Sequence, residues 1–233
     1  MHASNTGDGV AGLPLCWHGL PLELRPEGAL LLPGVSALLI ADFHLGKAHS
    51  FRRLGVPVPG GTTADLLLRL DDLLARVRPQ QLVFLGDFLH AATAQASPAL
   101  RHFAEWRGRH ADLRLTLVRG NHDDRAGDPP SALDMGVVDE PWALGGLQLC
   151  HHPLPLETPA PQSTGAPRVA GHWHPAAVLQ GRARDRVRLP CFCLSPSQLV
   201  LPAFGGFTGM HTVPAQPGLQ RFITDGQRVR ELA

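Results

Sequence analysis

The chain has 233 residues, a formal net charge of +1, and 44% hydrophobic against 18% charged residues. So high an apolar content with so little net charge excludes a mainly disordered chain, and the charge balance excludes a protein that binds polyanions through its overall field. Four cysteines are too few for a disulfide scaffold in a chain of this length. Residues 1–12 are small and polar, so we expect a disordered tail there and a single domain over 13–233. Neither a signal peptide nor an apolar run of membrane-spanning length is recognisable, so we expect a cytoplasmic protein without membrane contact.

The first half of the chain alternates between strand-like and helical patterns. Two apolar runs, 20–24 and 29–32, flank a turn-forming Arg-Pro-Glu-Gly segment and predict a β-hairpin. Runs without polar alternation predict strands buried on both faces over 37–41, 81–85 and 113–118. Apolar residues at helical spacing predict helices over 62–78 and 98–110, and the glycine- and proline-rich stretch 43–61 is expected to be a loop. This alternation predicts βαβ units around a central sheet.

The second half of the chain is expected to be rich in β-structure. Strand-like pieces occur at 147–150 and 168–170, and further ones follow residue 177 without intervening helices. The stretch 153–167 between them is long and rich in proline, glycine, serine and threonine. A segment of this kind is either a functional lid or a disordered loop.

A polar cluster follows each of five strand-like runs. The five clusters are Asp42-Phe43-His44, Gly86-Asp87, Gly120-Asn121-His122-Asp123, His151-His152 and Gly171-His172-Trp173-His174. Because ligands of such sheets bind at the carboxyl ends of strands, we expect these side chains to converge. Carboxylate, imidazole and amide groups together suit manganese, iron or zinc rather than a thiolate site or an all-oxygen cage. Seven or eight such groups are too many for one tetrahedral ion and fit two ions that share a carboxylate, an arrangement that serves displacement at phosphorus.

The order of these clusters resembles the calcineurin-like metallophosphoesterase family, whose motifs are D-x-H, G-D-x-x-[DN], G-N-H-[DE], a strand-terminal His and G-H-x-H. The second motif departs from the family pattern, because GDFLH places His90 where Asp or Asn is usual. A closer resemblance, carried by ADFHLGK, FRRLGVPVP and LPAFGGFTGM, is to the DNA-ligase-associated phosphoesterases called PdeM. The resemblance implies an α/β sandwich of two mixed β-sheets flanked by helices, with a dinuclear metal site at the strand ends.

The resemblance also implies a ligand set for two divalent ions, foremost Mn²⁺, with iron or zinc as alternatives. The first ion is expected on Asp42, His44, Asp87 and His174. The second ion is expected on Asp87, Asn121, His151 and His172, so that Asp87 bridges the pair. His151 is favoured because it directly follows the strand-like run 147–150, and His152 is the alternative.

Further residues are candidates for catalysis and for substrate binding. His122 is expected to donate to a phosphoryl oxygen or to protonate the leaving group, and Asp123 either orients its ring or caps a turn. Arg52, Arg53 and His90 form the expected substrate-binding set, although the two arginines fit a solvated loop equally well.

The resemblance implies that a metal-bridging hydroxide hydrolyses phosphodiester bonds, in a nuclease that acts on DNA in repair and works with a DNA ligase or helicase. One alternative is a phosphodiesterase or phosphatase of a small nucleotide, and another is a non-catalytic interaction scaffold on the same fold. The alternating arginines 182, 184, 186 and 188 predict either a track for a nucleic-acid backbone or, the favoured interpretation, the polar outer face of a hairpin. Cys191 and Cys193 would form a structural zinc site with His172 and His174 in one alternative, and buried free thiols in the favoured one.

Overall fold

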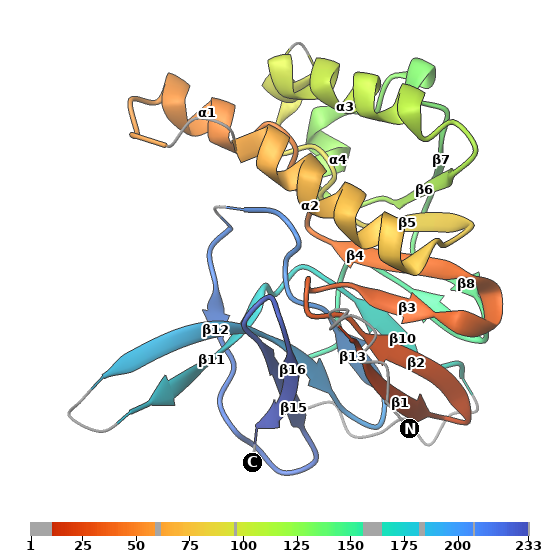
Figure 1. Ribbon diagram of the computed structural model, residues 1–233, viewed down its shortest axis with the longest axis vertical. Coiled ribbons are helices and arrows are strands. Elements are labelled where there is room, and N and C mark those ends of the chain that lie inside the picture. The colour runs from red at the N-terminus through yellow and green to blue at the C-terminus, as the bar shows by residue number, and fades with distance from the viewer. Residues whose placement is uncertain are drawn as a thin grey trace, which may run out of the picture.

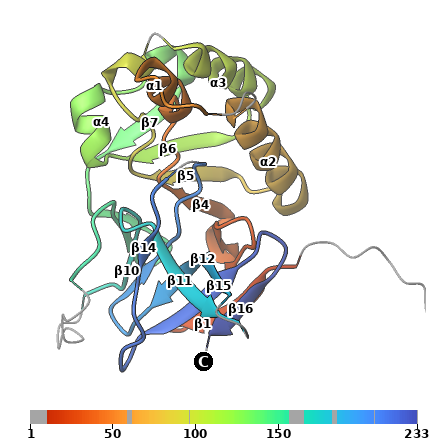
Figure 2. The ribbon, with the colours of Figure 1, turned by 90° about the vertical axis from the view of Figure 1, so that its left-hand side faces the viewer.

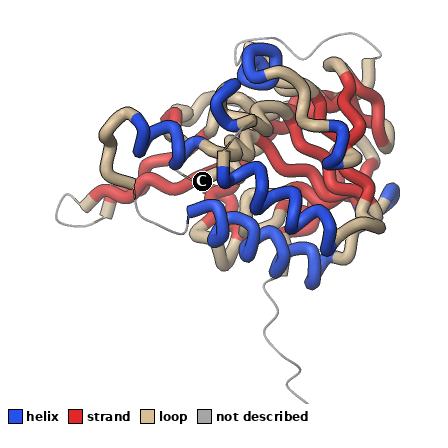
Figure 3. The backbone as a smooth tube through the Cα atoms, turned by 90° about the horizontal axis from the view of Figure 1, so that it is seen from above, coloured by secondary structure: helices blue, strands red, loops and turns tan. Residues whose placement is uncertain are grey.

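The computed structural model describes residues 11–58, 62–95, 97–155, 165–181, 185–206 and 208–232. Two β-sheets pack face to face, and helices cover the outer face of the first sheet (Figures 1 and 3). This is the expected α/β sandwich of two mixed sheets. Residues 1–10 of the predicted tail lie outside the described residues, and none of the described helices is long and apolar enough to span a membrane.

The first sheet has seven strands that follow one another in chain order. They are β1 (Leu13–Trp17), β2 (Leu20–Leu24), β3 (Leu30–Leu32), β4 (Ala37–Ala41), β5 (Gln81–Leu85), β6 (Arg114–Val118) and β7 (Met135–Val138). The pairing is antiparallel from β1 to β4 and parallel from β4 to β7. The predicted hairpin is therefore β2–β3, and the carboxyl ends of β4, β5 and β6 meet at one edge of the sheet.

Two long helices cover the outer face of this sheet, α2 (Thr62–Val77) and α3 (Pro98–Arg109) (Figure 3). α3 begins where the Ser97 hydroxyl accepts the N–H of Leu100, with Pro98 at the first helical position. Three short 3₁₀ turns span Pro33–Val35, Ala92–Ala94 and Ser131–Leu133.

Two short helices were not predicted, α1 (Lys47–Arg53) and α4 (Asn121–Ala126). The expectation of a loop over 43–61 was wrong where α1 lies. Only Ala48 is buried in α1, so its sequence carries no apolar stripe that would indicate a helix.

The second sheet has nine strands. They are β8 (Trp142–Leu144), β9 (Leu147–Leu149), β10 (Arg168–Ala170), β11 (Pro175–Gln180), β12 (Arg186–Leu194), β13 (Gln198–Val200), β14 (His211–Thr212), β15 (Gln220–Thr224) and β16 (Val229–Leu232). β9, β10 and β13 run parallel, so their carboxyl ends also share one edge. β11 and β12 form an antiparallel hairpin that projects beyond the sandwich (Figure 1).

The apolar core has three parts, which the alternation of side chains along the strands explains. Leu38 and Ile40 of β4 pack under α2 and α3, whereas Leu39 of the same strand packs between the two sheets. Cys191 and Cys193 lie in a third cluster with Val200 and Val213, and their sulfur atoms are 3.8 Å apart. The alternative zinc site was wrong, because His172 and His174 contact His151 and Asp42 instead.

Candidate metal centre

The five motifs meet at the edge where the two sheets come together. The chain after β13 lies beside the end of β4, because the N–H groups of Phe204 and Gly205 donate to the carbonyls of Ala41 and Asp42. This contact brings the carboxyl ends of the parallel strands of both sheets to a common rim. The candidate ligands follow these strands: Asp42 and His44 after β4, Asp87 after β5, Asn121 after β6, His151 after β9, and His172 and His174 after β10.

The backbone of this rim is left-handed at most of the candidate ligands. Nine non-glycine residues of the described chain have positive φ, and five of these nine are Asp42, His44, Asp87, His172 and His174, with φ between 48° and 70°. Each such residue costs roughly 1–2 kcal/mol relative to ordinary backbone. Strain of this kind persists where the surrounding structure over-determines it, and it gathers at functional sites.

The glycines of the motifs allow the strand ends to approach closely. A Cβ atom on Gly86, which has a φ of +73°, would lie 2.1 Å from Nδ1 of His151. A Cβ atom on Gly120 would lie 2.5 Å from the backbone nitrogen of Asp87. Side chains at these two positions would therefore push apart the residues that the motifs bring together.

Asp42, His44 and His174 form the first group of candidate ligands. Nε2 of His174 lies 3.3 Å from Oδ1 of Asp42 and 3.4 Å from Nε2 of His44. Asp42 Oδ1 is fully buried and has no hydrogen-bond partner among the described residues. Nε2 of His44 also lies 3.9 Å from Oδ2 of Asp87, which links this group to the second one.

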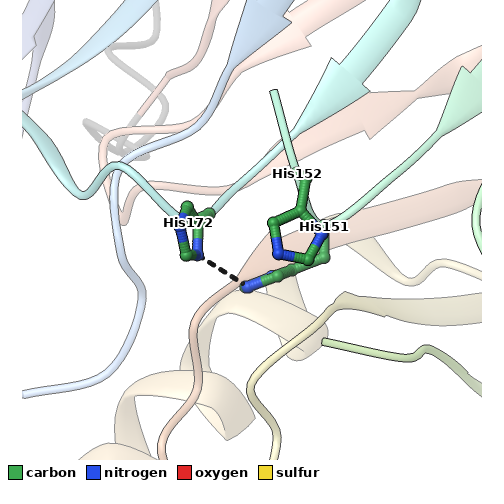
Figure 4. Close-up of side chains that lie close together, drawn as sticks. All are labelled: His151, His152 and His172. Atoms are coloured by element: carbon green, nitrogen blue, oxygen red, sulfur yellow. Dashed lines mark hydrogen bonds between the residues drawn. The ribbon is translucent and has the colours of Figure 1, made fainter. Parts of the chain in front are cut away.

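The second group gathers around His151, which is completely buried. Its Nε2 atom lies 3.0 Å from Oδ1 of Asn121, 2.9 Å from Nδ1 of His172 and 3.4 Å from Oδ1 of Asp87. Figure 4 shows His151 and His172 directed toward each other, with the ring of His152 beside them. One oxygen of Asp87 therefore faces each group, a placement that would allow this carboxylate to bridge two ions.

Backbone carbonyls fix the orientation of three imidazole rings at the site. Nδ1 of His151 donates to the carbonyl of Leu85 (3.1 Å). In the same way, Nδ1 of His174 donates to the carbonyl of Gly209 (3.0 Å), and Nδ1 of His122 to that of His90 (2.8 Å). Because a carbonyl only accepts, each neutral ring carries its proton on Nδ1 and keeps the lone pair on Nε2. In His151 and His174 that lone pair points into the ligand groups, as a metal ligand needs.

Burial governs the protonation of these rings. Burial lowers the pKa of His44 far below its usual value, lowers that of His172, and lowers that of His90 to about 4. Burial also opposes protonation of His174, but its close approach to the negative carboxylate of Asp42 outweighs burial and raises the pKa of His174. Asp42 and His174 could together hold a metal ion, which would then take the place of that proton.

This donor set fits divalent metal ions. Buried carboxylate oxygens and imidazole lone pairs converge there, including the unpartnered Oδ1 of Asp42. Three sets of ligand atoms lie within 4.8 Å of one another: Asp42, His44 and His174; Asp42, Asp87 and His151; and His151, His152 and His172. Mixed oxygen and imidazole ligands suit manganese, iron and zinc.

His152 lies at the edge of the site rather than at its centre. It is exposed, and its Nδ1 atom lies 2.5 Å from Oε1 of Glu140. The other oxygen of Glu140 accepts the N–H groups of His151 (2.6 Å) and His152 (2.9 Å). Glu140 therefore holds the turn that carries both histidines.

Asp123 has a different contact from the one expected of an orienting carboxylate. Its two oxygens accept the N–H groups of Phe88, Leu89 and Gly120, and burial raises its pKa to about 6. The ring of His122 is oriented by the carbonyl of His90 instead. Asp123 thus ties together two loops of the rim and caps the first turn of α4 through the N–H of Gly120, which is the second of its two expected roles; it does not orient His122.

The expected substrate-binding residues divide into two places. His90 lies over the site, where its ring stacks on His122 with centroids 5.2 Å apart and meets His44 edge-on. Arg52 and Arg53 are exposed on α1, which projects away from the sheets (Figure 1). Arg52 donates to the carbonyl of Val58.

Sequence reasoning missed three contributors to the site. Lys47 is half-buried, and although burial lowers its pKa, the charges of Asp42 and Asp87 act to raise it. The ADFHLGK motif contains this lysine, so its place after the first cluster was the available signal. Glu140 and the carbonyl of Gly209 carried no such signal, because both reach the site only through tertiary contacts.

Comparison with known proteins gives a family and similar solved structures. The sequence model of the calcineurin-like phosphoesterase family matches residues 35–176. The chain is similar to the crystal structure of the nuclease MPE of Pseudomonas putida, with 42% identity, a TM-score of 0.80, and coverage of 95% of this chain and 100% of that one. It is also similar to YfcE, a phosphoesterase from E. coli, with 16% identity, a TM-score of 0.40, and coverage of 84% and 98%. No curated protein sequence gives a significant match.

Proposed function

Because the chain belongs to the calcineurin-like phosphoesterase family, whose members use divalent metals to hydrolyse phosphoesters, we propose that it is a dinuclear phosphodiesterase that cleaves nucleic acid. One observation carries the dinuclear part of this proposal. Asp87 turns one oxygen toward His44 and the other toward His151, so a single carboxylate lies between two groups of ligands. The similarity to a nuclease supports the nucleic-acid part.

The proposed ligands of the first ion are Asp42, His44, Asp87 and His174, and those of the second are Asp87, Asn121, His151 and His172. Manganese is the metal we favour, with iron or zinc as alternatives for the same ligands. When bound, the two ions would polarise the phosphoryl group and activate water for in-line attack.

The chain's own side chains provide the remaining chemistry. His122 lies at the mouth of the site with about a third of its side chain exposed, and its Nε2 atom is 3.9 Å from Oδ2 of Asp87. The carbonyl of His90 holds its Nδ1 proton, so Nε2 is the atom that donates to a phosphoryl oxygen or protonates the leaving oxygen. Lys47 places a positive charge beside the carboxylates, where it would attract the negatively charged substrate.

A role in DNA repair is part of the proposal, because the chain resembles DNA-ligase-associated phosphoesterases and is similar to a nuclease. A DNA ligase or helicase is the partner we propose on the same ground. These assignments depend on the relatives and not on the geometry of the site.

The proposal is tested by metal analysis together with turnover of bis-p-nitrophenyl phosphate. We expect about two metal ions per chain, and we expect Asp87→Asn to lose metal and at least about 100-fold in kcat. Asp112→Asn is the matched control, because that carboxylate is exposed and belongs to no ligand group of the described residues. Chains that take up no metal and turn over no diester would overturn the proposal and favour a non-catalytic scaffold.

A further inference from the structure

The β11–β12 hairpin ends in an extension that we call the arm, defined as residues 178–180 of β11 and 186–188 of β12. Val178 pairs with Arg188 and Gln180 with Arg186 in its antiparallel register. Both arginines are exposed. Arg182 and Arg184 of the alternating series lie outside the described residues, so the argument depends on Arg186 and Arg188 alone.

The two arginines lie on the inner face of the second sheet. Side chains two residues apart share a face of a strand, so Arg186 and Arg188 share theirs with Phe192. Phe192 is buried in the core between the two sheets, whereas its neighbours Cys191 and Cys193 lie in the cluster on the outer face. The arginine face therefore continues the surface of the second sheet that faces the first sheet. Arg186 and Arg188 are exposed on a hairpin, as the favoured interpretation of a polar hairpin face expects.

A hydrogen-bonded segment connects the arm to the candidate metal centre. Nη1 of Arg188 donates to the carbonyl of Met210, at 3.5 Å. The neighbouring carbonyl of Gly209 accepts from Nδ1 of His174, and the N–H of His211 donates to the carbonyl of His174. Arg188 thus contacts the residue next to the carbonyl that orients a proposed metal ligand.

Helix α1 projects on the same side of the molecule as the arm (Figure 1). After a quarter turn, α1 lies above the rim and β11 below it (Figure 2). α1 carries the exposed Arg52 and Arg53 and is followed by Leu54, which is 77% exposed. Met210, between the arm and the rim, is 39% exposed. Guanidinium groups beside exposed apolar side chains complement a single nucleic-acid strand, because such a strand presents both phosphates and bases.

We propose that the arm binds the phosphate backbone of a nucleic-acid strand outside the metal centre, through Arg186 and Arg188, while the scissile bond lies at the metals. This inference depends on the proposed function. Because the whole chain has a net charge of only +1, attraction to a polyanion must come from local groups of this kind. A small diester occupies only the metal centre, so the arm adds affinity for a polymer and none for a small diester.

The test compares Arg186→Gln/Arg188→Gln with the matched double variant Arg228→Gln/Arg230→Gln. The control arginines are also exposed, two residues apart at a hairpin, and remove the same charge. Binding of a fluorescent oligonucleotide is measured by anisotropy in excess chelator over a range of salt concentrations. Inhibition of bis-p-nitrophenyl phosphate turnover by the same oligonucleotide is measured with the metal-loaded enzyme.

Loss of two phosphate contacts should reduce the slope of log affinity against log salt by about 1.4 for a single strand or about 1.8 for a duplex. If the affinities converge near 1 M salt, this is roughly a 25- to 60-fold loss at 0.1 M. The control variant should bind as the wild type does, and all three proteins should turn over the small diester equally.

Two results would overturn the role of the arm: an arm variant with wild-type affinity and salt slope, or a control variant that loses as much affinity. A wild-type enzyme that turns over the small diester but neither binds nor is inhibited by the oligonucleotide would refute the proposed nuclease function itself. The failure of one proposal is thus separated from the failure of the other.

Discussion

Replacing Gly86 by alanine tests whether close approach of the two sheets builds the metal centre. A Cβ atom at Gly86 would lie 2.1 Å from Nδ1 of His151, at a φ of +73°. Gly19 has nearly the same φ, +76°, but no atom within 4 Å of its Cβ position, so Gly19→Ala is a control for the backbone effect alone. Left-handed backbone should cost each variant about 1–2 kcal/mol. Overpacking against His151 should add about 1–3 kcal/mol, which gives a total of roughly 2–5 kcal/mol for Gly86→Ala.

The two variants should also differ in metal binding. The alanine would push His151 away from the carbonyl of Leu85, so its Nε2 atom would leave Asn121 and Asp87. Urea unfolding of the metal-free proteins measures the loss of stability, and calorimetric titration with Mn²⁺ measures affinity. Equal destabilisation of the two variants, together with unchanged metal affinity in Gly86→Ala, would refute the reasoning.

Three other predictions follow from contacts of the rim. Asp123→Asn should destabilise the protein by about 1–3 kcal/mol in urea unfolding, because the new amide turns a donor toward a backbone N–H, whereas the exposed Asp124→Asn should change little. Glu140→Gln should weaken Mn²⁺ binding by about 10-fold in calorimetric titration, because Glu140 holds the turn of His151 and His152, whereas Asp139→Asn should not. Wild-type affinity in Glu140→Gln would contradict that role. Removing metal that was present at a hundredfold excess over its Kd should lower Tm by about 5–10 °C in a thermal melt, and an unchanged Tm would argue against ligands from both sheets.

The strands could be predicted because each one is determined by a short, continuous run of apolar residues. The runs 37–41 and 81–85 became β4 and β5 with the expected bounds, and both strands are buried along their whole length, which explains their lack of polar alternation. Each polar cluster begins within two residues of the end of a strand, so the topology of the sheets is enough to bring the clusters together. The joint pattern was therefore informative where each single motif was weak.

The parts that could not be predicted depend on contacts between distant segments. The orientation of His122 comes from the carbonyl of His90, and a sequence records a side chain but not the direction of a carbonyl. The face on which Arg186 and Arg188 lie follows from the packing of Phe192 between the sheets, which their own alternation does not specify. Glu140 precedes β8 and reaches His151 and His152 from the strand paired with β9, eleven and twelve residues away along the chain.

The proposed ligands are divided between two stretches of chain, with consequences for the time at which activity arises during synthesis. Asp42, His44, Asp87 and Asn121 follow strands of the first sheet, whereas the three remaining histidines belong to the second sheet and are synthesised later. His174 is held by Gly209, which follows still later. A ribosome-bound chain that has completed only its first sheet thus carries Asp42, Asp87 and His44 without the three later histidines. Under the proposed function, hydrolysis would therefore begin only after nearly the whole polypeptide has been made and its halves have docked, so an unfinished chain would leave the nucleic acid around it intact.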